Sequence, residues 1–252
     1  MSADPATAFL RPDWPAPAHV RAVVTTRAGG ISSGPYASFN LATHVGDDPA
    51  AVAANRVRLR DALGLQREPA WLSQIHGATV VDAAAAAPGV EADAAFSTRP
   101  AVCCVVLTAD CLPILFCDAA GTRVAAVHAG WRGLAAGIVT ATVTRLGGAP
   151  GDLLAWIGPG IGAGAYTVGA ELRATFCARD PAFAAAFSRR DGRWHADLRA
   201  IAHRELAQHG IGWIGGYAGC TFEESERFYS YRREAVTGRM ASLVWRMPPG
   251  RR

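Results

Sequence analysis

The chain has 252 residues, half of them hydrophobic, and a formal net charge of +4 at pH 7. That length can bury a substantial core and lies near the upper size of one domain. The arginines are scattered and form no Lys/Arg block, which argues against nucleic acid as a partner. No window reaches the apolar length of a membrane span, and the first residues lack the pattern of a signal peptide. Six cysteines without a regular framework suit a reducing compartment, so we expect a cytoplasmic protein.

The first quarter of the chain predicts an arm, a strand, a long loop and a helix. Residues 1–18 are rich in Pro and Ala and are expected to form an N-terminal arm. Residues 20–26 are apolar and β-branched, which is typical of a strand. The segment 28–48 is crowded with Gly, Ser, Pro and Asn, and a loop of that length within a compact domain is usually functional. Pro49 then opens a predicted helix that extends to about Leu63, after two aspartates that can cap it.

Short apolar runs bounded by breakers follow, as expected for strands that are covered on both faces. The predicted strands are 71–75, 78–83, 93–97, 102–107, 114–116, 124–127, 153–157, 211–214 and 242–245. Further helices are predicted at 130–146, 170–177 and 198–208. Strands and helices alternate only irregularly, so the pattern does not predict a doubly wound sheet.

Residues that can bind a metal interrupt three of these apolar runs, each where a strand is expected to end. They are His76, Cys111 and His128, and each stands close to a Gly or Pro. Two imidazoles with one thiolate form a ligand set that suits Zn²⁺, with one position left open for water or substrate. Any one of these residues alone is more often a core or loop histidine, or a small buried thiol. Their joint placement at strand ends favours a metal site.

The spacing of these three residues excludes a zinc finger. Structural zinc modules pair their ligands about two to five residues apart, whereas His76, Cys111 and His128 are widely separated in the sequence. The fold itself must bring them together, and a three-ligand site assembled in that way is more often catalytic than structural. We therefore assign all three as metal ligands and as catalytic residues.

Several blocks of the sequence, including these three runs, resemble one protein family. The blocks are Thr25-Thr26-Arg27-Ala28-Gly29-Gly30, Asn40-Leu41, His44-Val45-Gly46-Asp47, Gln74-Ile75-His76-Gly77, Asp93 to Thr98, Thr108-Ala109-Asp110-Cys111-Leu112-Pro113, His128-Ala129-Gly130-Trp131-Arg132-Gly133, Gly158-Pro159-Gly160-Ile161-Gly162, Ser230-Tyr231-Arg232-Arg233 and Thr237-Gly238-Arg239. In this order they closely resemble the signature of the YfiH/PgeF family, also called laccase-domain or multicopper polyphenol oxidase proteins. The resemblance covers nearly the whole chain.

This resemblance implies a fold and an activity. The fold would be α+β, with mixed β-sheets packed with helices in a single YfiH-like catalytic domain over residues 19–252. Members of the family are described as purine nucleoside phosphorylases, which convert adenosine, inosine or S-methyl-5′-thioadenosine plus phosphate into the free base and ribose 1-phosphate, with adenosine deaminase activity. Their His, Cys and His ligands map onto His76, Cys111 and His128. The expected cofactor is Zn²⁺, with copper as the alternative metal.

Such chemistry needs positive groups beside the metal. One thiolate and two neutral imidazoles leave one positive charge on Zn²⁺, enough to polarise a bound water for deamination. Cleavage of a glycosidic bond by phosphate needs further cations, and a guanidinium group matches phosphate oxygens in a two-pronged geometry. The predicted substrate- and phosphate-binding residues are Arg27, Asn40, Arg232 and Arg233. The alternative for each arginine is a solvated or structural ion pair.

Three other functions stay open on the sequence alone. Cys111 as nucleophile and His128 as its base would make a metal-free hydrolase, and editing of peptidoglycan precursors would be a variant of that class. Copper-dependent oxidation of phenols would need more copper ligands than this sequence supplies near the site, where His44 is the one spare and is expected to be a loop histidine. A zinc ion that only stabilises the fold is the third alternative.

Two details of the sequence bear on the substrate and on ligand geometry. Family members often have Cys-Tyr-Glu-Val-Gly where this chain has Ala165-Tyr166-Thr167-Val168-Gly169, so Thr167 replaces a carboxylate. The substrate range would differ if that carboxylate acts on the base. Asp110 either orients a metal ligand or only shapes a turn, and Pro113 nearby favours the turn.

Overall fold

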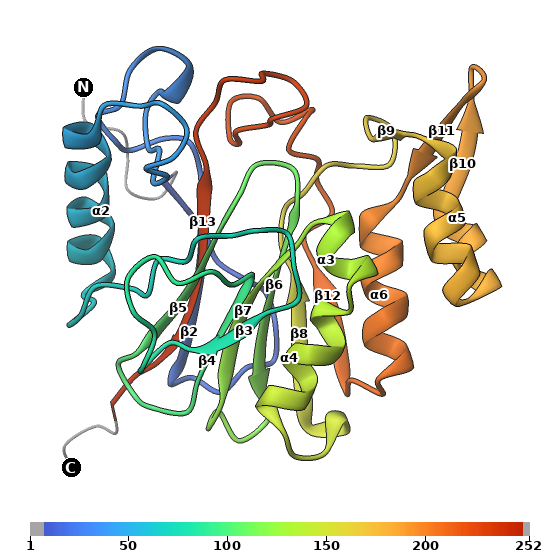
Figure 1. Cartoon of the computed structure of the whole chain (residues 1–252). Coiled ribbons are helices and arrows are strands. Elements are labelled where there is room, and N and C mark those ends of the chain that lie inside the picture. Colours follow the sequence, from blue (N-terminus) through green and yellow to red (C-terminus); the bar gives the residue numbers. More distant parts are fainter. Residues whose placement is uncertain (1–7, 249–252) are drawn as a thin grey trace.

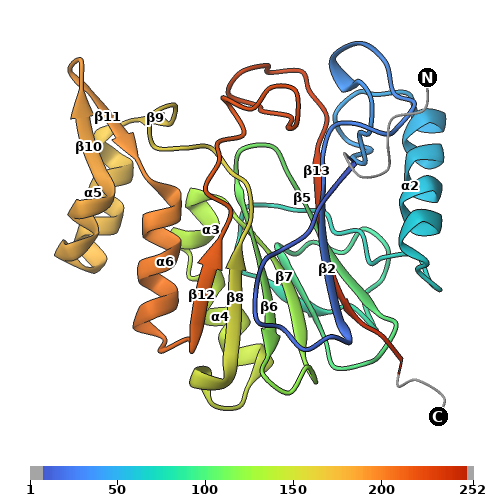
Figure 2. The ribbon, with the colours of Figure 1, turned by 180° about the vertical axis from the view of Figure 1, so that it is seen from behind.

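The computed structural model describes residues 8–248, which are arranged in four layers (Figure 1, Figure 2). Two β-sheets pack against each other in the middle. Helix α2 (Pro49–Leu63) covers the outer face of one sheet, and helices α4 (Ile138–Leu146) and α6 (Leu198–Gln208) cover the outer face of the other. The predicted α+β fold of mixed sheets packed with helices is confirmed.

The first sheet has four antiparallel strands in the order β1-β2-β13-β5. The strands are β1 (Phe9–Leu10), β2 (Val20–Thr25), β13 (Met240–Arg246) and β5 (Cys103–Thr108). Within the expected arm, Phe9 pairs with Thr25 of β2, while residues 1–7 lie outside the described range. The boundary between an arm at 1–18 and a catalytic domain at 19–252 stays a prediction.

The second sheet is mixed and has the order β12-β8-β6-β7-β4-β3. The strands are β12 (Trp213–Gly216), β8 (Leu153–Ile157), β6 (Leu112–Asp118), β7 (Val124–Ala129), β4 (Ala94–Ser97) and β3 (Val80–Asp82). The two outer pairings are parallel and the three central ones are antiparallel. Strands β6 and β7 are buried along their whole length, which explains why their sequences are continuous apolar runs.

Side chains from both sheets fill the space between them. Val24 and Val244 of the first sheet belong to the same buried cluster as Leu115 and Ala126 of the second. A larger core lies between the second sheet and its helices, and a smaller one lies between the first sheet and α2. A one-residue shift of register would turn every side chain of a central strand to the opposite face, into a core that is packed around other side chains. The packing therefore fixes the level at which each strand ends.

Two further helices and a small sheet complete the described chain. Helix α3 (Trp131–Ala135) follows β7 directly, and α5 (Ala170–Arg179) lies beside a three-stranded sheet. That sheet contains β9 (Thr167–Val168), β10 (Phe187–Arg190) and β11 (Arg193–Ala196). Short 3-10 helices occupy Gly34–Tyr36, Pro150–Asp152 and Pro181–Ala186. Among residues 8–248, no helix combines the length and the apolar character needed to cross a membrane.

The boundaries of α2 follow from its capping residues, as predicted. The Asp48 carboxylate accepts a hydrogen bond from the Ala50 backbone N–H at 2.9 Å, which satisfies one of the free donors in the first turn. Gly64 ends the helix with a left-handed φ of +61°, a conformation that glycine adopts without steric cost.

Two predicted elements are wrong, and the strands β1, β9, β10 and β11 were not predicted. The segment 130–146 is two helices instead of one, because Gly137 adopts φ +86° between α3 and α4. The predicted strand at 71–75 contributes only an isolated bridge from Ser73 to Glu91. The hairpin of β10 and β11 was not predicted, since its short strands contain no apolar run and β10 is exposed at three of its four residues. Its turn contains Asp191-Gly192, a pair that is typical of hairpins.

We expect Gly137→Ala to lower the melting temperature by a few degrees. Left-handed backbone costs a residue with a Cβ roughly 1–2 kcal/mol. Gly151→Ala is the matched control, because an added Cβ meets nothing within 4 Å at either position and only Gly137 has a left-handed φ. Thermal unfolding followed by circular dichroism measures both. Equal melting temperatures for the two variants would contradict a backbone origin of the break.

Candidate metal centre

Antiparallel pairing of β6 and β7 brings two of the predicted ligands to one rim of the second sheet. Leu112, the first residue of β6, pairs with Ala129, the last residue of β7. Cys111 and His128 are therefore neighbours at this rim. His76 reaches the same rim from the loop that precedes β3, so the sequence prediction that the three residues meet at strand ends has a simple topological basis.

The side chains of these three residues converge. Each of His76, Cys111 and His128 offers a ligand atom within 4.8 Å of the other two, and the two imidazole centroids are 4.7 Å apart with the rings inclined at 77°. Within the described part of the chain this is the one group of His, Cys, Asp and Glu found with such spacing, and it could hold a metal ion. Gly130 makes the approach feasible, because a Cβ there would lie 2.9 Å from Cys111 Sγ and 3.2 Å from His76 Cδ2.

A buried carboxylate, Asp93, holds two of these ligands in place. Its Oδ1 accepts a hydrogen bond from His128 Nδ1 at 2.8 Å and from the His76 backbone N–H at 2.9 Å. Its Oδ2 accepts from the backbone N–H of Gly77 at 2.6 Å and of Ile75 at 3.3 Å. A proton on Nδ1 of His128 leaves Nε2 free to bind a metal, which is the usual orienting role of such a partner.

The same carboxylate stabilises an unusual backbone conformation. His76 has φ +60°, a region that few residues with a Cβ adopt, and one that costs about 1–3 kcal/mol. The donors that flank it all point at Asp93, which has no exposed surface. Burial raises the pKa of Asp93, but the hydrogen bonds from His128, Gly77 and His76 outweigh it and hold the pKa below its usual value.

The thiol and imidazole of the site shift each other's pKa. Burial raises the pKa of Cys111, but the charge and hydrogen bonds of His128 and His76 outweigh it and lower that pKa to about 6. Burial lowers the pKa of His128, but Cys111 and Asp93 outweigh it and raise that pKa to about 9. The sulfur is thus ready to act as a thiolate at neutral pH, the form that binds metals or attacks electrophiles.

A cavity of about 460 Å³ opens onto the three ligands. Its lining residues are His44, Gln74, His76, Leu107, Thr108, Ala109, Cys111, His128, Arg132, Tyr231 and Arg239. Arg132 is exposed, whereas burial lowers the pKa of Arg239 below its ordinary value, so that this cation sits partly out of water. The volume lies within the usual range of small-molecule sites, about 300–1,000 Å³.

The arginines predicted to bind phosphate lie outside this lining. Arg27 donates to the carbonyls of Ala37 and Ser225, at 3.1 Å and 2.9 Å. The Arg232 guanidinium donates to the Thr167 carbonyl at 2.8 Å. Arg233 donates to three carbonyls between residues 221 and 228. All three brace loops around the site, and their assignment to phosphate stays a prediction.

Asn40 and Asp110 act on the loops that carry cavity residues. Asn40 is buried, and its side-chain oxygen accepts the backbone N–H of Arg239 at 3.0 Å. Asp110 has φ +91°, and its carboxylate accepts from Thr221 Oγ1 at 2.7 Å and from the Arg232 N–H at 2.6 Å. Asp110 therefore ties the turn that carries Cys111 to the C-terminal loop, and its side chain accepts from Thr221 and Arg232 instead of from a ligand ring.

Sequence reasoning missed Asp93, Arg132 and Arg239 as site residues. All three stand in blocks that resemble the family, but only their position in space separates them from neighbouring polar residues. Asp93 directly precedes β4, and β4 pairs with β7, so a carboxylate at the start of a strand beside His128 was the signal available. Thr167, where a carboxylate was expected, lies 3.2 Å from His195 Nε2 and does not line the cavity.

The fold is α+β with mixed sheets, and it brings two histidines and one cysteine together at one rim of a sheet, beside a cavity. These features define a protein with a candidate metal centre whose ligands are assembled by the fold. Residues 21–247 match the family model described as multi-copper polyphenol oxidoreductase laccase. The chain is 54% identical over 241 residues to a purine nucleoside phosphorylase of Pseudomonas aeruginosa, covering 94% of this chain and 98% of that one. It is 47% identical over 238 residues to the purine nucleoside phosphorylase YfiH of Escherichia coli, with the same coverage.

Solved structures show the same fold. A Neisseria meningitidis protein, NMB0706, superposes with a TM-score of 0.92 at 48% identity, over 96% of this chain and all of that one, 100%. YlmD of Geobacillus stearothermophilus superposes with a TM-score of 0.86 at 31% identity, over 96% of this chain and 100% of that one. The chain belongs to the YfiH/PgeF family of laccase-domain proteins, and the family predicted from the sequence is confirmed.

We expect Asp93→Asn to weaken zinc binding by about 10- to 100-fold. The asparagine amide keeps one acceptor oxygen, but its NH₂ group would face N–H groups that donate to the carboxylate in the parent protein. His128 and the His76 loop would therefore lose their fixed orientation. Competition with a chromogenic zinc chelator at neutral pH measures the affinity.

Asp118→Asn is the matched control for this change. Asp118 is also a buried carboxylate that accepts several hydrogen bonds, but it ends β6 at the edge opposite Cys111. It should lower stability and leave zinc affinity unchanged. Equal affinities for the two variants would contradict an orienting role of Asp93.

Proposed function

We propose that this chain is a zinc-dependent purine nucleoside phosphorylase. The observation that carries the proposal is the juxtaposition of the His76, Cys111 and His128 ligand atoms with a cavity that two arginines also line. Two of the relatives reported above, 54% and 47% identical to this chain, are named purine nucleoside phosphorylases, and the similarity covers 98% of each. A nucleoside and phosphate are therefore the proposed substrates.

The donor set favours zinc among the common metals. One sulfur and two imidazole nitrogens suit Zn²⁺, whereas Mg²⁺ and Ca²⁺ prefer oxygen ligands. Bound there by three protein ligands, zinc would supply Lewis acidity at an open position facing the cavity. His76, Cys111 and His128 would hold it, and Asp93 would keep His128 in the tautomer that presents Nε2.

We propose Arg132 and Arg239 as the phosphate-binding residues, in place of Arg27, Arg232 and Arg233. Both line the cavity that contains the ligands. Arg239 donates through Nη1 to the Thr237 and Gly238 carbonyls at 2.9 Å each, so its head group is fixed at little further entropic cost. A fixed cation in a partly buried cavity stabilises phosphate more than one in water does.

In phosphorolysis, a phosphate oxygen forms a bond to ribose C1′ as the bond from C1′ to N9 of the purine breaks. The base leaves with the electron pair of that bond and takes up a proton, giving free base and ribose 1-phosphate. We propose adenosine, inosine and S-methyl-5′-thioadenosine as substrates, and deamination of adenosine by water at the same centre as a side activity.

The second candidate is a metal-free Cys/His hydrolase, for example one that edits peptidoglycan precursors. It is favoured by the lowered pKa of Cys111, about 6, beside His128, since a thiolate next to an imidazolium is the arrangement of cysteine nucleophiles. Copper-dependent phenol oxidation ranks below both. The description of the matched family model names it, but the described residues supply one three-residue group for a metal and His44 stands outside that group.

We expect purified protein to convert inosine and phosphate into hypoxanthine, and Cys111→Ala to reduce the rate to background. The change removes the one sulfur ligand. Cys177→Ala is the control, since Cys177 is a free, partly exposed thiol on α5. Chelation should abolish the activity of the parent protein, and added Zn²⁺ should restore it. Full activity after complete metal removal would instead support the hydrolase mechanism or another metal-free reaction.

We also expect Arg132→Met to raise the KM for phosphate by roughly tenfold or more, because a hydrogen bond to a charged group is lost. The KM for inosine should change little. Arg232→Met is the matched comparison, since Arg232 is also exposed but contacts the Thr167 carbonyl. Steady-state kinetics with each substrate varied separately gives both constants. A larger effect at Arg232 would return phosphate binding to the arginine predicted from the sequence.

A further inference from the structure

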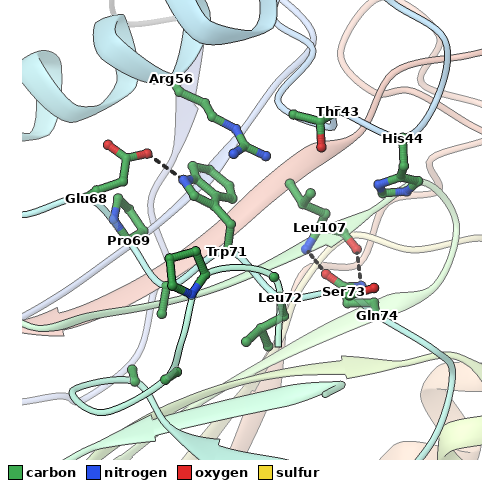
Figure 3. Close-up of a pocket in the computed structure, with 15 residues that line it drawn as sticks. Thr43, His44, Arg56, Glu68, Pro69, Trp71, Leu72, Ser73, Gln74 and Leu107 are labelled. Atoms are coloured by element: carbon green, nitrogen blue, oxygen red, sulfur yellow. Dashed lines mark hydrogen bonds between the residues drawn. The ribbon is translucent and has the colours of Figure 1, made fainter. Parts of the chain in front are cut away.

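A second, larger cavity adjoins the one at the metal ligands. It has a volume of about 760 Å³ and shares His44, Gln74 and Leu107 with the smaller cavity (Figure 3). The remaining walls come from helix α2 through Arg56, from the segment around Trp71, and from the turn after β3 through Ala86 and Pro88. A ligand bound at the metal could therefore extend past His44 into this second space.

The shared wall of the two cavities is rigid. The Gln74 side chain donates to the Leu107 carbonyl at 2.8 Å and accepts the Leu107 backbone N–H at 2.7 Å. Both ends of the amide are thus occupied by one backbone unit (Figure 3). Gln74 is thereby held in a fixed orientation as a partition between the two cavities, and the lining of the larger cavity supplies further polar groups.

The most conspicuous of these groups is Arg56. Its Nε donates to the Leu41 carbonyl at 3.0 Å, and its guanidinium lies 4.0 Å from the centroid of the Trp71 ring. The Trp71 indole N–H in turn donates to Glu68 at 2.5 Å. Figure 3 shows the guanidinium reaching down from α2 over the indole. Among the described residues, the two terminal nitrogens of Arg56 make no hydrogen bond.

A guanidinium held in this way is typical of a group that binds a ligand, and less typical of one that only stabilises the fold. An arginine whose guanidinium is simply solvated at the protein surface keeps its rotamer freedom. Arg56 is half-buried, is stacked on an aromatic face, and is anchored through one nitrogen. Burial lowers its pKa below the ordinary value, with Glu68 acting in the opposite direction. Its remaining donors are therefore held in place, partly desolvated, at the edge of a cavity large enough for a purine.

We propose that the larger cavity binds the purine base of the substrate, and that Arg56 donates hydrogen bonds to the O6 and N7 edge of a 6-oxopurine. This inference rests on the proposed function, with ribose and phosphate in the smaller cavity and the base beyond His44. A guanidinium matches the two acceptors of a 6-oxopurine, O6 and N7, whereas a 6-aminopurine offers only N7 as an acceptor and presents an amino donor instead of O6.

The same contact assists bond cleavage. When the bond from C1′ to N9 breaks, its electron pair stays with the purine, and the negative charge spreads toward N7 and O6. Donors held at that edge stabilise the departing base more than the intact nucleoside. Arg56 is thereby a specificity-determining residue that favours inosine and guanosine over adenosine.

Equilibrium binding of free bases tests the proposal without turnover. Calorimetric titration of the parent protein and of Arg56→Met with hypoxanthine, adenine and inorganic phosphate gives three affinities for each. We expect hypoxanthine binding to weaken roughly 10- to 100-fold in the variant, adenine binding to weaken less, and phosphate binding to stay unchanged. Arg58→Met is the matched control, because Arg58 is exposed on the same helix and makes one long contact of 3.5 Å to the Gly29 carbonyl.

A second variant guards against loss of folding in Arg56→Met. Ala86→Phe adds a bulky side chain at another part of the cavity lining, and Ala86 is not among the contacts of Arg56. It should weaken binding of both bases and spare phosphate. Unchanged hypoxanthine affinity in both variants overturns the proposal, and so does loss of phosphate binding in Arg56→Met, which would make this an anion site. If base binding follows the expectation but inosine is not cleaved by the parent protein, the proposed function fails and the base site stands.

Discussion

The geometry of the candidate metal centre depends on one buried carboxylate. Asp93 receives the His128 ring and the backbone of the His76 loop on its two oxygens, and so joins a strand residue and a loop residue that are far apart in the sequence. Loss of the carboxylate would leave the buried His128 ring without this hydrogen bond, which is costly, and would release the exposed His76 loop from its anchor. The loop conformation, the His128 tautomer and the ionised state of Asp93 therefore support one another.

Much of this centre could be predicted from the sequence, because the residue types that end a strand are recognisable there. Breakers after apolar runs located Cys111 and His128 at the ends of strands, and the pairing of Leu112 with Ala129 then brings them together. Helix α2 was equally predictable, since Asp48 and Gly64 are local capping signals. The division of the segment 130–146 was not, because a glycine inside an apolar helical pattern can be tolerated at a cost of about 1 kcal/mol and does not by itself end a helix.

The groups that surround the ligands could not be chosen from sequence alone. Arg232 and Arg239 both stand in family-like blocks, yet Arg239 lines the cavity while Arg232 donates to the Thr167 carbonyl. Which way a guanidinium points depends on carbonyls supplied by distant loops, and those contacts carry no periodic signal. Asp93 was hidden for a similar reason, because three of its four donors are backbone N–H groups, which every residue except proline carries. Arg56 becomes visible only through its contact with Trp71.

The proposed metal centre requires that His76, Cys111 and His128 bind one divalent cation together. X-ray absorption spectroscopy at the zinc edge, on protein loaded with one equivalent of Zn²⁺, tests this directly. We expect one sulfur at about 2.3 Å and two imidazole nitrogens at about 2.0–2.1 Å, with a light-atom ligand completing the shell. In Cys111→Ala the sulfur contribution should vanish. A parent spectrum without sulfur, or one that keeps its sulfur in that variant, would contradict the claim.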